Sequence, residues 1–330
     1  MAAAPPPRVC VVIISYNSSL TLPQCLDSLA GQTFTDFCLL LIDNASDERP
    51  RPDLSRFPFP ASYVEMEENL GFAQAMNVAL GSTVSPLLAA LNPDAFPAAE
   101  WLAELVAAAD QYSDVAAFGS LQISAADHKR IDGFGDHYLV TGQAWRGETL
   151  PAADPRQPLD YCFGVCAAAA LYRTEVLRRL GGFDGRFFCF YEDVDVCFRL
   201  RLAGWQCAAV RSAVVRHVGG ASFEGKSELA EFLLARNQWW VFFKNMPLAL
   251  FAIGAPALIA IQLLAGLKNR RRASLRGLWQ GLCGTGGFLT SRQEIQAARK
   301  ISTRELCRWL TWQPAKFFAK ETVITPVNPS

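Results

Sequence analysis

Three carboxylates lie inside an apolar stretch near residue 190. The segment FCFYEDVDVCFRLRLAGW places Glu192, Asp193 and Asp195 among aromatic and aliphatic side chains. Acidic residues favour the first turn of a helix, and Asp195 could pair with Arg199 four residues later. These ordinary explanations account for Asp195 and partly for Glu192, but they leave Asp193 open. A carboxylate at a helix start within an apolar collar has the setting that raises its pKa, as a general base requires, so Asp193 is the candidate base.

Asp94 is the candidate ligand for a divalent cation. It follows an apolar run, and Mg²⁺ and Mn²⁺ prefer carboxylate, water and phosphate oxygens. A cation held there could bridge the phosphates of a nucleotide. His217 is one of only three histidines and is expected in a polar turn with Gly219 and Ser222. A lone histidine is more often structural than a metal ligand, so its type alone does not assign it.

Apolar runs alternate with helical patterns through the first two thirds of the chain. This alternation predicts an α/β fold with a mostly parallel sheet that is covered on both faces. The expected strands are 9–15, 38–43, 61–66, 86–91 and 115–119, and the expected helices are 21–31, 71–82 and 98–110. Beyond them we expect an irregular hairpin or flap at 128–150, a buried strand in FGVCAAAALY, a helix in RTEVLRRLGGFD ended by Gly181 and Gly182, and a helix beginning at Glu224.

The residues directly after the predicted strands are small and polar. They are Ser15-Tyr16-Asn17, Asp43-Asn44-Ala45-Ser46 and Asn92-Pro93-Asp94, and Asn69 can cap the helix after the third strand. Each group alone is a common turn or cap. Together they meet at the edge where such sheets bind ligands, and Asp43 could accept a hydrogen bond from a nucleobase N–H. Because a Walker loop and a G-x-G-x-x-G motif are both absent, the pattern predicts another kind of nucleotide-diphosphate site.

The amino-acid composition limits the type of protein and the cellular compartment in which it is expected. The chain is 51% hydrophobic and 19% charged, which excludes a disordered protein. Its ten cysteines show no paired metal spacing, and the N-terminus lacks a signal-peptide pattern, so we expect a cytoplasmic protein with free thiols. The net charge of zero hides a basic tail with 12 Lys and Arg against 3 Asp and Glu from Leu267 onward. Such a tail favours an anionic surface as its partner; we expect no nucleic acid partner.

Several motifs in order give the sequence a family resemblance. VVIISYN, LIDNASDE, NLGFAQAMNVAL, LNPDAF, GGFDGRFFCFYEDVDVCFRLRLAGW and HVGGAS resemble the motifs of family 2 glycosyltransferases over residues 8–245. The nearest likeness is to the rhamnosyltransferase-like branch that builds cell-surface polysaccharides. The resemblance implies a GT-A fold for 8–245, a nucleotide-sugar donor, a divalent metal (Mg²⁺ or Mn²⁺) and inversion at the anomeric carbon of the sugar.

The resemblance also implies roles for individual positions. Asp43 matches the residue that reads the nucleobase, and Asp193 matches the general base, with Glu192 aiding acceptor binding or orienting the loop. Asn92 replaces the first aspartate of the family's Asp-x-Asp motif, so Asp94 is the main metal and diphosphate residue, and His217 matches a late metal-site histidine. The predicted nucleotide-sugar site comprises Ser15, Tyr16, Asn17, Asp43, Asn69, Gly71, Asn77, Asn92 and Asp94.

The C-terminal region, 246–330, is predicted to be helical and membrane-associated. Residues 246–267 carry no charge over 22 positions, which is long enough to cross a bilayer, and basic residues follow at 268–272. A single crossing would export the basic tail against the positive-inside rule. We therefore expect the segment to lie in or dip into the inner face of the cytoplasmic membrane, as a peripheral or monotopic element. The alternative is a helical subdomain with an apolar core of its own.

Three functions remain open at this stage. The favoured one is an inverting glycosyltransferase that moves L-rhamnose from dTDP-rhamnose to a lipid-linked or polysaccharide acceptor. A UDP-sugar-dependent transferase and a catalytically inactive nucleotide-sugar-binding scaffold are the alternatives. The presence of Asp94, Asp193 and His217 argues against the scaffold. A nucleotide-dependent oxidoreductase is disfavoured because the sequence lacks the glycine fingerprint of that class. The sugar, the acceptor, the linkage and the oligomeric state are left undetermined.

Overall fold

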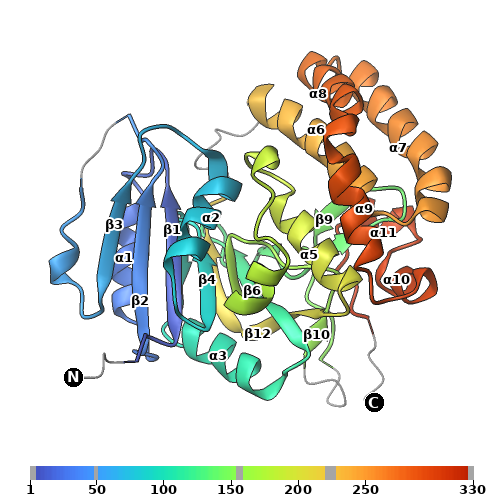
Figure 1. Ribbon diagram of the computed structural model, residues 1–330. Helices are drawn as coiled ribbons and strands as arrows, with labels where there is room; N and C mark the ends of the chain where they lie inside the picture. Colours follow the sequence, from blue (N-terminus) through green and yellow to red (C-terminus); the bar gives the residue numbers. More distant parts are fainter. Residues whose placement is uncertain (1–4, 48–50, 154–158, 220–227, 326–330) are drawn as a thin grey trace.

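A large central sheet organises the structure, a computed structural model that describes residues 5–47, 51–153, 159–219 and 228–325. Among these residues the sheet has ten strands, and its main path runs β10-β12-β6-β11-β4-β1-β2-β3. The sheet occupies the left and centre of Figure 1, and the C-terminal helices, coloured orange to red, gather at the right. The fold is α/β with a mostly parallel sheet, as predicted.

The four strands at one end of the sheet are parallel. They are β1 (Val9–Ser15), β2 (Phe37–Asp43), β3 (Ala61–Glu65) and β4 (Leu87–Leu91), connected through α1 (Leu22–Ala30), the 3₁₀ turn η1 (Leu54–Arg56) and α2 (Gly71–Ser82). The predicted bounds of these strands and of both α-helices agree with the structure to within one residue at each end. Parallel pairing brings the carboxyl ends of β1, β2 and β4 to one edge of the sheet.

The other end of the sheet contains long and antiparallel strands. β6 (Val115–Ser124) pairs in parallel with β12 (Gln206–His217), and β11 (Ala169–Arg173) runs antiparallel between β4 and β6. Short strands complete this end: β5 (Ala95–Pro97), β7 (Ile131–Gly133) and β10 (Asp160–Tyr161). The predicted strand in FGVCAAAALY is confirmed as β11, and its direction shows that the parallel pattern is interrupted here.

Helices cover both faces of the sheet because alternate strand residues point to opposite sides. Val9, Val11 and Ile13 face an apolar cluster with α1 and α3 (Trp101–Gln111). Cys10 and Val12 face a second cluster, which contains residues from α2, α4 (Thr174–Arg179) and α5 (Glu192–Leu202). Nearly continuous apolar strands are therefore explained by burial on both sides.

The predicted hairpin at 128–150 is confirmed. β8 (Asp136–Tyr138) and β9 (Ala144–Arg146) form a separate two-stranded antiparallel sheet, next to β7 on the main sheet. The predicted helix after β11 is also confirmed as α4, and Gly181 and Gly182 follow it with φ of 80° and 69°. The short η2 (Gly185–Phe187) then leads to α5.

The C-terminal third is helical. Its helices are α6 (Glu228–Asn245), α7 (Leu248–Lys268), α8 (Arg272–Cys283), η3 (Gly284–Phe288), α9 (Leu289–Ala297), α10 (Thr303–Trp309) and α11 (Pro314–Phe318). The start of α6 predicted at Glu224 lies outside the described residues. A third apolar cluster joins Phe198 of α5 to Phe242 of α6, Leu258 of α7 and Leu306 of α10. The helices therefore share one core with α5, and the division at residue 245 stays a prediction.

Candidate active site

A cavity of ≈ 380 Å³ lies at the carboxyl edge of the parallel strands. Many of the residues predicted for the site line it: Tyr16, Asn69, Gly71, Asn92, Asp94, Glu192, Asp193 and His217. The loops after β1 and β4, the start of α2, the start of α5 and the end of β12 supply these residues. The topology therefore brings together side chains that are up to two hundred positions apart in the sequence.

Two asparagines shape the wall next to α2. Asn44 Nδ2 donates to Asn69 Oδ1 over 2.9 Å, and Asn44 Oδ1 accepts from the Leu70 N–H over 3.0 Å. Asn69 Oδ1 also accepts from the Gly71 N–H over 2.9 Å, but the N-cap position of α2 is Leu70, so Asn69 precedes the cap instead of occupying it. Asn44 lines the cavity as well, although it was not among the residues predicted for the nucleotide-sugar site.

Ser15, Asn17 and Asp43 lie just behind this wall and do not line the cavity. The Asn17 and Asp47 side chains bond each other over 2.9 Å, which ties the loop after β1 to the loop after β2. Asp43 is buried, and its Oδ1 accepts from the Ser46 hydroxyl over 2.5 Å. Its Oδ2 has no hydrogen-bond partner among the described residues. The structure places Asp43 behind the cavity lining, so its contact with a nucleobase stays a prediction.

The structure places Asn77 away from the cavity. Its side-chain amide donates to the Phe183 carbonyl over 2.6 Å and accepts from the Phe183 N–H over 2.8 Å. These bonds join α2 to the loop before η2. The prediction that Asn77 contacts the nucleotide-sugar is therefore not supported: its side chain holds α2 against this loop and does not line the cavity.

Asp94 and His217 meet because β5 pairs with the end of β12. Ala95 lies opposite His217 in this antiparallel pair, and the Val218 N–H donates to the Asp94 carbonyl over 3.0 Å. The expected polar turn is wrong for His217, which is the last residue of β12 because the strand continues until it pairs with β5; Ser222, predicted for the same turn, lies outside the described residues. Its Nε2 lies 3.4 Å from Asp94 Oδ1, and both side chains are 6% exposed.

Asp132 orients the imidazole of His217. Asp132 Oδ2 lies 2.8 Å from His217 Nδ1, and Arg146 Nη1 lies 3.2 Å from the same Oδ2. Burial acts to lower the pKa of His217, but hydrogen bonds with Asp132 and Asp94 outweigh burial and raise it. Neither Asp132 nor Arg146 was predicted from the sequence. Their signal, an Asp and an Arg in a glycine-rich hairpin, is too weak to find without the fold.

These residues fit a divalent cation. His217 Nε2 faces a buried carboxylate oxygen of Asp94 at 3.4 Å, so a nitrogen and an oxygen that can both bind a cation lie side by side. Two ligands at about 2.1 Å from a cation lie roughly 3 Å apart, close to the separation of these atoms. A carboxylate that holds the other nitrogen of a ligating histidine is a recurrent arrangement in metal sites. Asp94 and His217 would therefore hold the ion, with Asp132 fixing the ring.

Asp193 lies in the first turn of α5 and faces the same cavity. Its Oδ2 accepts from the Ala167 N–H over 3.1 Å, and its Oδ1 accepts from the Val194 N–H over 2.8 Å. Backbone donors from two segments thus orient the carboxylate while leaving it at the cavity wall. Glu192 is buried beside it, and burial followed by the charge of Asp193 raises the pKa of Glu192 well above its usual value.

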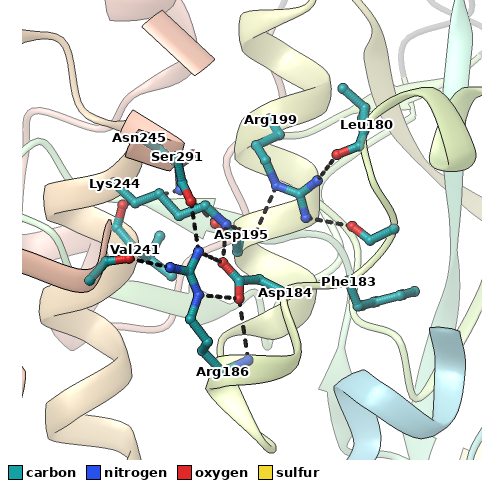
Figure 2. A network of polar contacts seen from close by, with 12 residues as sticks. Leu180, Phe183, Asp184, Arg186, Asp195, Arg199, Val241, Lys244, Asn245 and Ser291 are labelled. Carbon is teal, nitrogen blue, oxygen red and sulfur yellow. Dashed lines mark hydrogen bonds and ion pairs between the residues drawn. The ribbon is translucent and has the colours of Figure 1, made fainter. Parts of the chain in front are cut away.

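Asp195 belongs to a buried ionic network (Figure 2). The predicted pair with Arg199 is present at 2.8 Å, and Lys244 Nζ lies 2.9 Å from the same carboxylate oxygen. Burial acts to raise the pKa of Asp195, but the charges of Arg199 and Lys244 outweigh burial and lower it. Breaking a buried ion pair typically costs about 3–5 kcal/mol of stability. These contacts support the structural role that was predicted for Asp195.

Three bulky residues before α5 have a left-handed backbone. Phe188, Phe190 and Tyr191 have φ of 67°, 67° and 68°. All three line the cavity, and a Cβ added to Gly71 would lie 2.5 Å from the Phe188 carbonyl oxygen. Positive φ at a bulky residue costs roughly 1–3 kcal/mol and persists only where the surroundings enforce it. The segment 188–191 is therefore a strained part of the cavity wall.

A second acidic group, Asp136 on β8, was also missed from the sequence. Ligand atoms of Asp136, Cys166 and Asp193 lie within 4.8 Å of one another. Burial, followed by the charge of Asp193, raises the pKa of Asp136 to about 8. Burial also raises the pKa of the Cys166 thiol to about 12, and sulfur is a soft ligand, whereas Mg²⁺ and Mn²⁺ prefer oxygen. Asp94 and His217 are the better pair for a hard cation.

Solved structures of two sugar transferases resemble this chain over most of its length. The solved structure of the mannosyltransferase PcManGT from Pyrobaculum calidifontis, in complex with GDP-Man and Mn²⁺, has a TM-score of 0.54 and 18% identity, covering 88% of this chain and 87% of that one. Staphylococcus aureus TarS 1–349 in complex with UDP-GlcNAc has a TM-score of 0.57 and 14% identity, covering 88% and 84%. The fold is therefore the GT-A fold of glycosyltransferases.

The sequence comparisons give the family. The sequence-family model described as Glycosyl transferase family 2 matches residues 10–181, just over half of the chain. The protein belongs to glycosyl transferase family 2. A curated relative, the N-acetylglucosaminyl-diphospho-decaprenol L-rhamnosyltransferase of Mycobacterium tuberculosis, is 28% identical over 306 residues, which cover 81% of this chain and 96% of the relative. The resemblance to this family and to a rhamnosyltransferase is thus confirmed.

Proposed function

We propose that this glycosyltransferase transfers L-rhamnose, with inversion, from dTDP-rhamnose to a lipid-linked acceptor in cell-envelope glycan synthesis. The observation that carries the proposal is one cavity lined both by the Asp94–His217 pair and by Asp193. An inverting transfer needs these two functions together, since a cation binds the departing diphosphate and a base receives the proton of the acceptor. The curated rhamnosyltransferase supports the sugar and an acceptor made of N-acetylglucosamine on a polyprenyl diphosphate.

The residues divide the reaction between them. Asp193 removes the proton from the acceptor hydroxyl as the new glycosidic bond forms, and positioned proton transfer typically contributes about 10²–10⁴-fold. Asp94 and His217 hold the cation, which when bound neutralises charge on the diphosphate leaving group. Asp43 binds the nucleobase of the donor, and the loop after β1 binds its nucleoside. Glu192, buried beside Asp193, supports the acceptor side of the cavity.

Calorimetric binding of nucleoside diphosphates tests the donor site. We expect TDP to bind purified protein with Mn²⁺ or Mg²⁺ and to bind much more weakly with EDTA, because Asp94 and His217 act on the phosphates only through a cation. Tighter binding of UDP than of TDP would favour the UDP-sugar alternative. Binding of neither nucleotide under any condition would overturn the proposed donor site. Turnover of dTDP-rhamnose with an N-acetylglucosaminyl-diphospho-farnesyl acceptor separates an enzyme from an inactive scaffold.

Helix α7 supports membrane association of the same protein. It is the one described helix that is long and apolar enough to cross a bilayer, and only 22% of its most apolar window is buried. Ile253 and Leu264 are 75% and 67% exposed on it. Exposed apolar side chains over such a length mark a site that another apolar surface covers. The basic residues 268–272 follow directly, so we propose that α7 docks on anionic lipid at the inner face of the cytoplasmic membrane.

Vesicle sedimentation tests the docking of α7. We expect the protein to sediment with vesicles that contain phosphatidylglycerol and less with phosphatidylcholine alone. The double substitution Ile253→Asp and Leu264→Asp should abolish sedimentation, because it places charges on the face that meets lipid. Val84→Asp is the matched control, since Val84 is 74% exposed but lies next to the sheet, before β4. Equal sedimentation of both variants would contradict the assignment.

A further inference from the structure

Helix α6 contacts the strained segment through one buried side chain. Asn237 is fully buried, and its Nδ2 lies 3.0, 2.8 and 2.8 Å from the carbonyl oxygens of Phe187, Cys189 and Phe190. Arg236 Nε donates to Asn237 Oδ1 over 2.9 Å, which fixes the orientation of the amide. Carbonyls that are close in sequence can converge on one donor only if the chain curls tightly. This convergence accounts for the positive φ of Phe188 and Phe190.

The same face of α6 also holds the first turn of α5. Lys244 and Asn245 follow Asn237 by seven and eight residues, a spacing that places all three on one side of a helix. Lys244 Nζ lies 2.7 Å from Asp184 Oδ2 and 2.9 Å from Asp195 Oδ2 (Figure 2). Asn245 Nδ2 donates to Asp195 Oδ1 over 2.8 Å. α6 therefore contacts the chain on both sides of Glu192 and Asp193.

We propose that α6 is the positioning element for the catalytic base, with Asn237 as its principal positioning residue. This inference rests on the proposed function, because it takes Asp193 as the base. Asn237 holds the wall 188–191 in its strained form, and Lys244 and Asn245 fix Asp195 one turn into α5. Asp193 lies between these two attachments. The helices that follow α6 include the apolar α7, so the part of the chain that meets the membrane is continuous with the part that aligns the base.

The competing explanation is that Asn237 only stabilises the fold. The two explanations differ in what they predict for folded protein. A stabilising contact lowers the melting temperature and leaves the kinetics of the folded fraction unchanged. A positioning contact lowers kcat while donor binding is kept, because small misplacements of a reacting group can cost about 10²-fold.

The test compares Asn237→Ala with Gln32→Ala. Gln32 is a matched control: it is buried, it bonds the backbone of Ala98 over 2.8 Å and of Leu102 over 3.0 Å, and it does not line the cavity. We expect both variants to lower the melting temperature. Only Asn237→Ala should lower kcat for rhamnose transfer, by about 10–100-fold, with the Kd of TDP–Mn²⁺ unchanged. Amide hydrogen exchange of the peptide 186–197 should accelerate in the same variant.

A second substitution tests the role of the strain itself. Phe190→Gly in the Asn237→Ala background should recover part of kcat, because glycine adopts positive φ without cost; Phe190→Gly alone gives the reference. If Asn237→Ala does not fold, Asn245→Ala is measured instead, and we expect the same split between kcat and Kd. An unchanged kcat in folded variants overturns the positioning role. Absence of transfer by the wild-type protein would instead overturn the proposed function, and the hydrogen exchange result would still show whether Asn237 holds the segment before α5 in place.

Discussion

Replacing Asp193 by asparagine is expected to abolish sugar transfer while leaving donor binding intact. Asparagine has the same shape, and its side-chain oxygen can keep the bond from the Ala167 N–H, which is 3.1 Å long in the structure. It cannot accept a proton at neutral pH, so the contribution of general base catalysis, about 10²–10⁴-fold, should be lost. The measurement is kcat for transfer from dTDP-rhamnose, together with calorimetric binding of TDP and Mn²⁺.

Glu192→Gln is the matched control for this experiment. Burial raises the pKa of Glu192 well above its usual value. Replacing Glu192 by the neutral glutamine should therefore change the charge of the site less than replacing Asp193 by asparagine. We expect the Glu192 variant to affect mainly the KM for the acceptor. If Asp193→Asn retains more than about a tenth of wild-type activity, the loss is smaller than base catalysis normally supplies and the assignment of the base is wrong.

The sequence predicted those parts of the molecule that depend on local patterns. Apolar runs and helical spacing gave β1 to β4, α1 and α2 nearly to the residue, because two-sided burial dictates the residue types at each strand position. The Asp195–Arg199 pair could also be predicted from a local pattern, since side chains four residues apart are neighbours on a helix. The edge of the sheet followed from the topology of parallel strands, so Tyr16, Asn92 and Asp94 could be placed in one site.

The remaining parts of the site depend on contacts between distant segments. Asp132 lies 85 residues from His217, and nothing in the local sequence links the two. Lys244 and Asn237 contact α5 and its preceding segment only because α6 packs across them. The positive φ at Phe188, Phe190 and Tyr191 runs against the preference of aromatic residues, so a propensity argument would not predict it. These features surround Asp193 and the Asp94–His217 pair, and local sequence rules are expected to fail at such sites.

Removing the Asp94 carboxylate is expected to abolish the metal dependence of nucleotide binding. In Asp94→Ala, His217 Nε2 would lose the oxygen that lies 3.4 Å away, and a single imidazole is a weak site for Mg²⁺ or Mn²⁺. TDP should then bind equally weakly with Mn²⁺ and with EDTA, and kcat should fall below detection. Asp27→Ala is the control, because this exposed carboxylate pairs at the surface with Arg56, at 3.1 Å.

Asp132→Asn should give an intermediate result that identifies how the metal is held. Asparagine can still bond one ring nitrogen of His217, but it does so without the negative charge that now faces Nδ1 at 2.8 Å. Loss of such an outer partner typically weakens metal affinity about 10–100-fold, so Mn²⁺ titration in the presence of TDP should shift by that factor. Wild-type Mn²⁺ affinity in both Asp94→Ala and Asp132→Asn would contradict this site. It would move the cation to other groups in the cavity, such as Asp136 and Asp193, whose ligand atoms lie within 4.8 Å of each other.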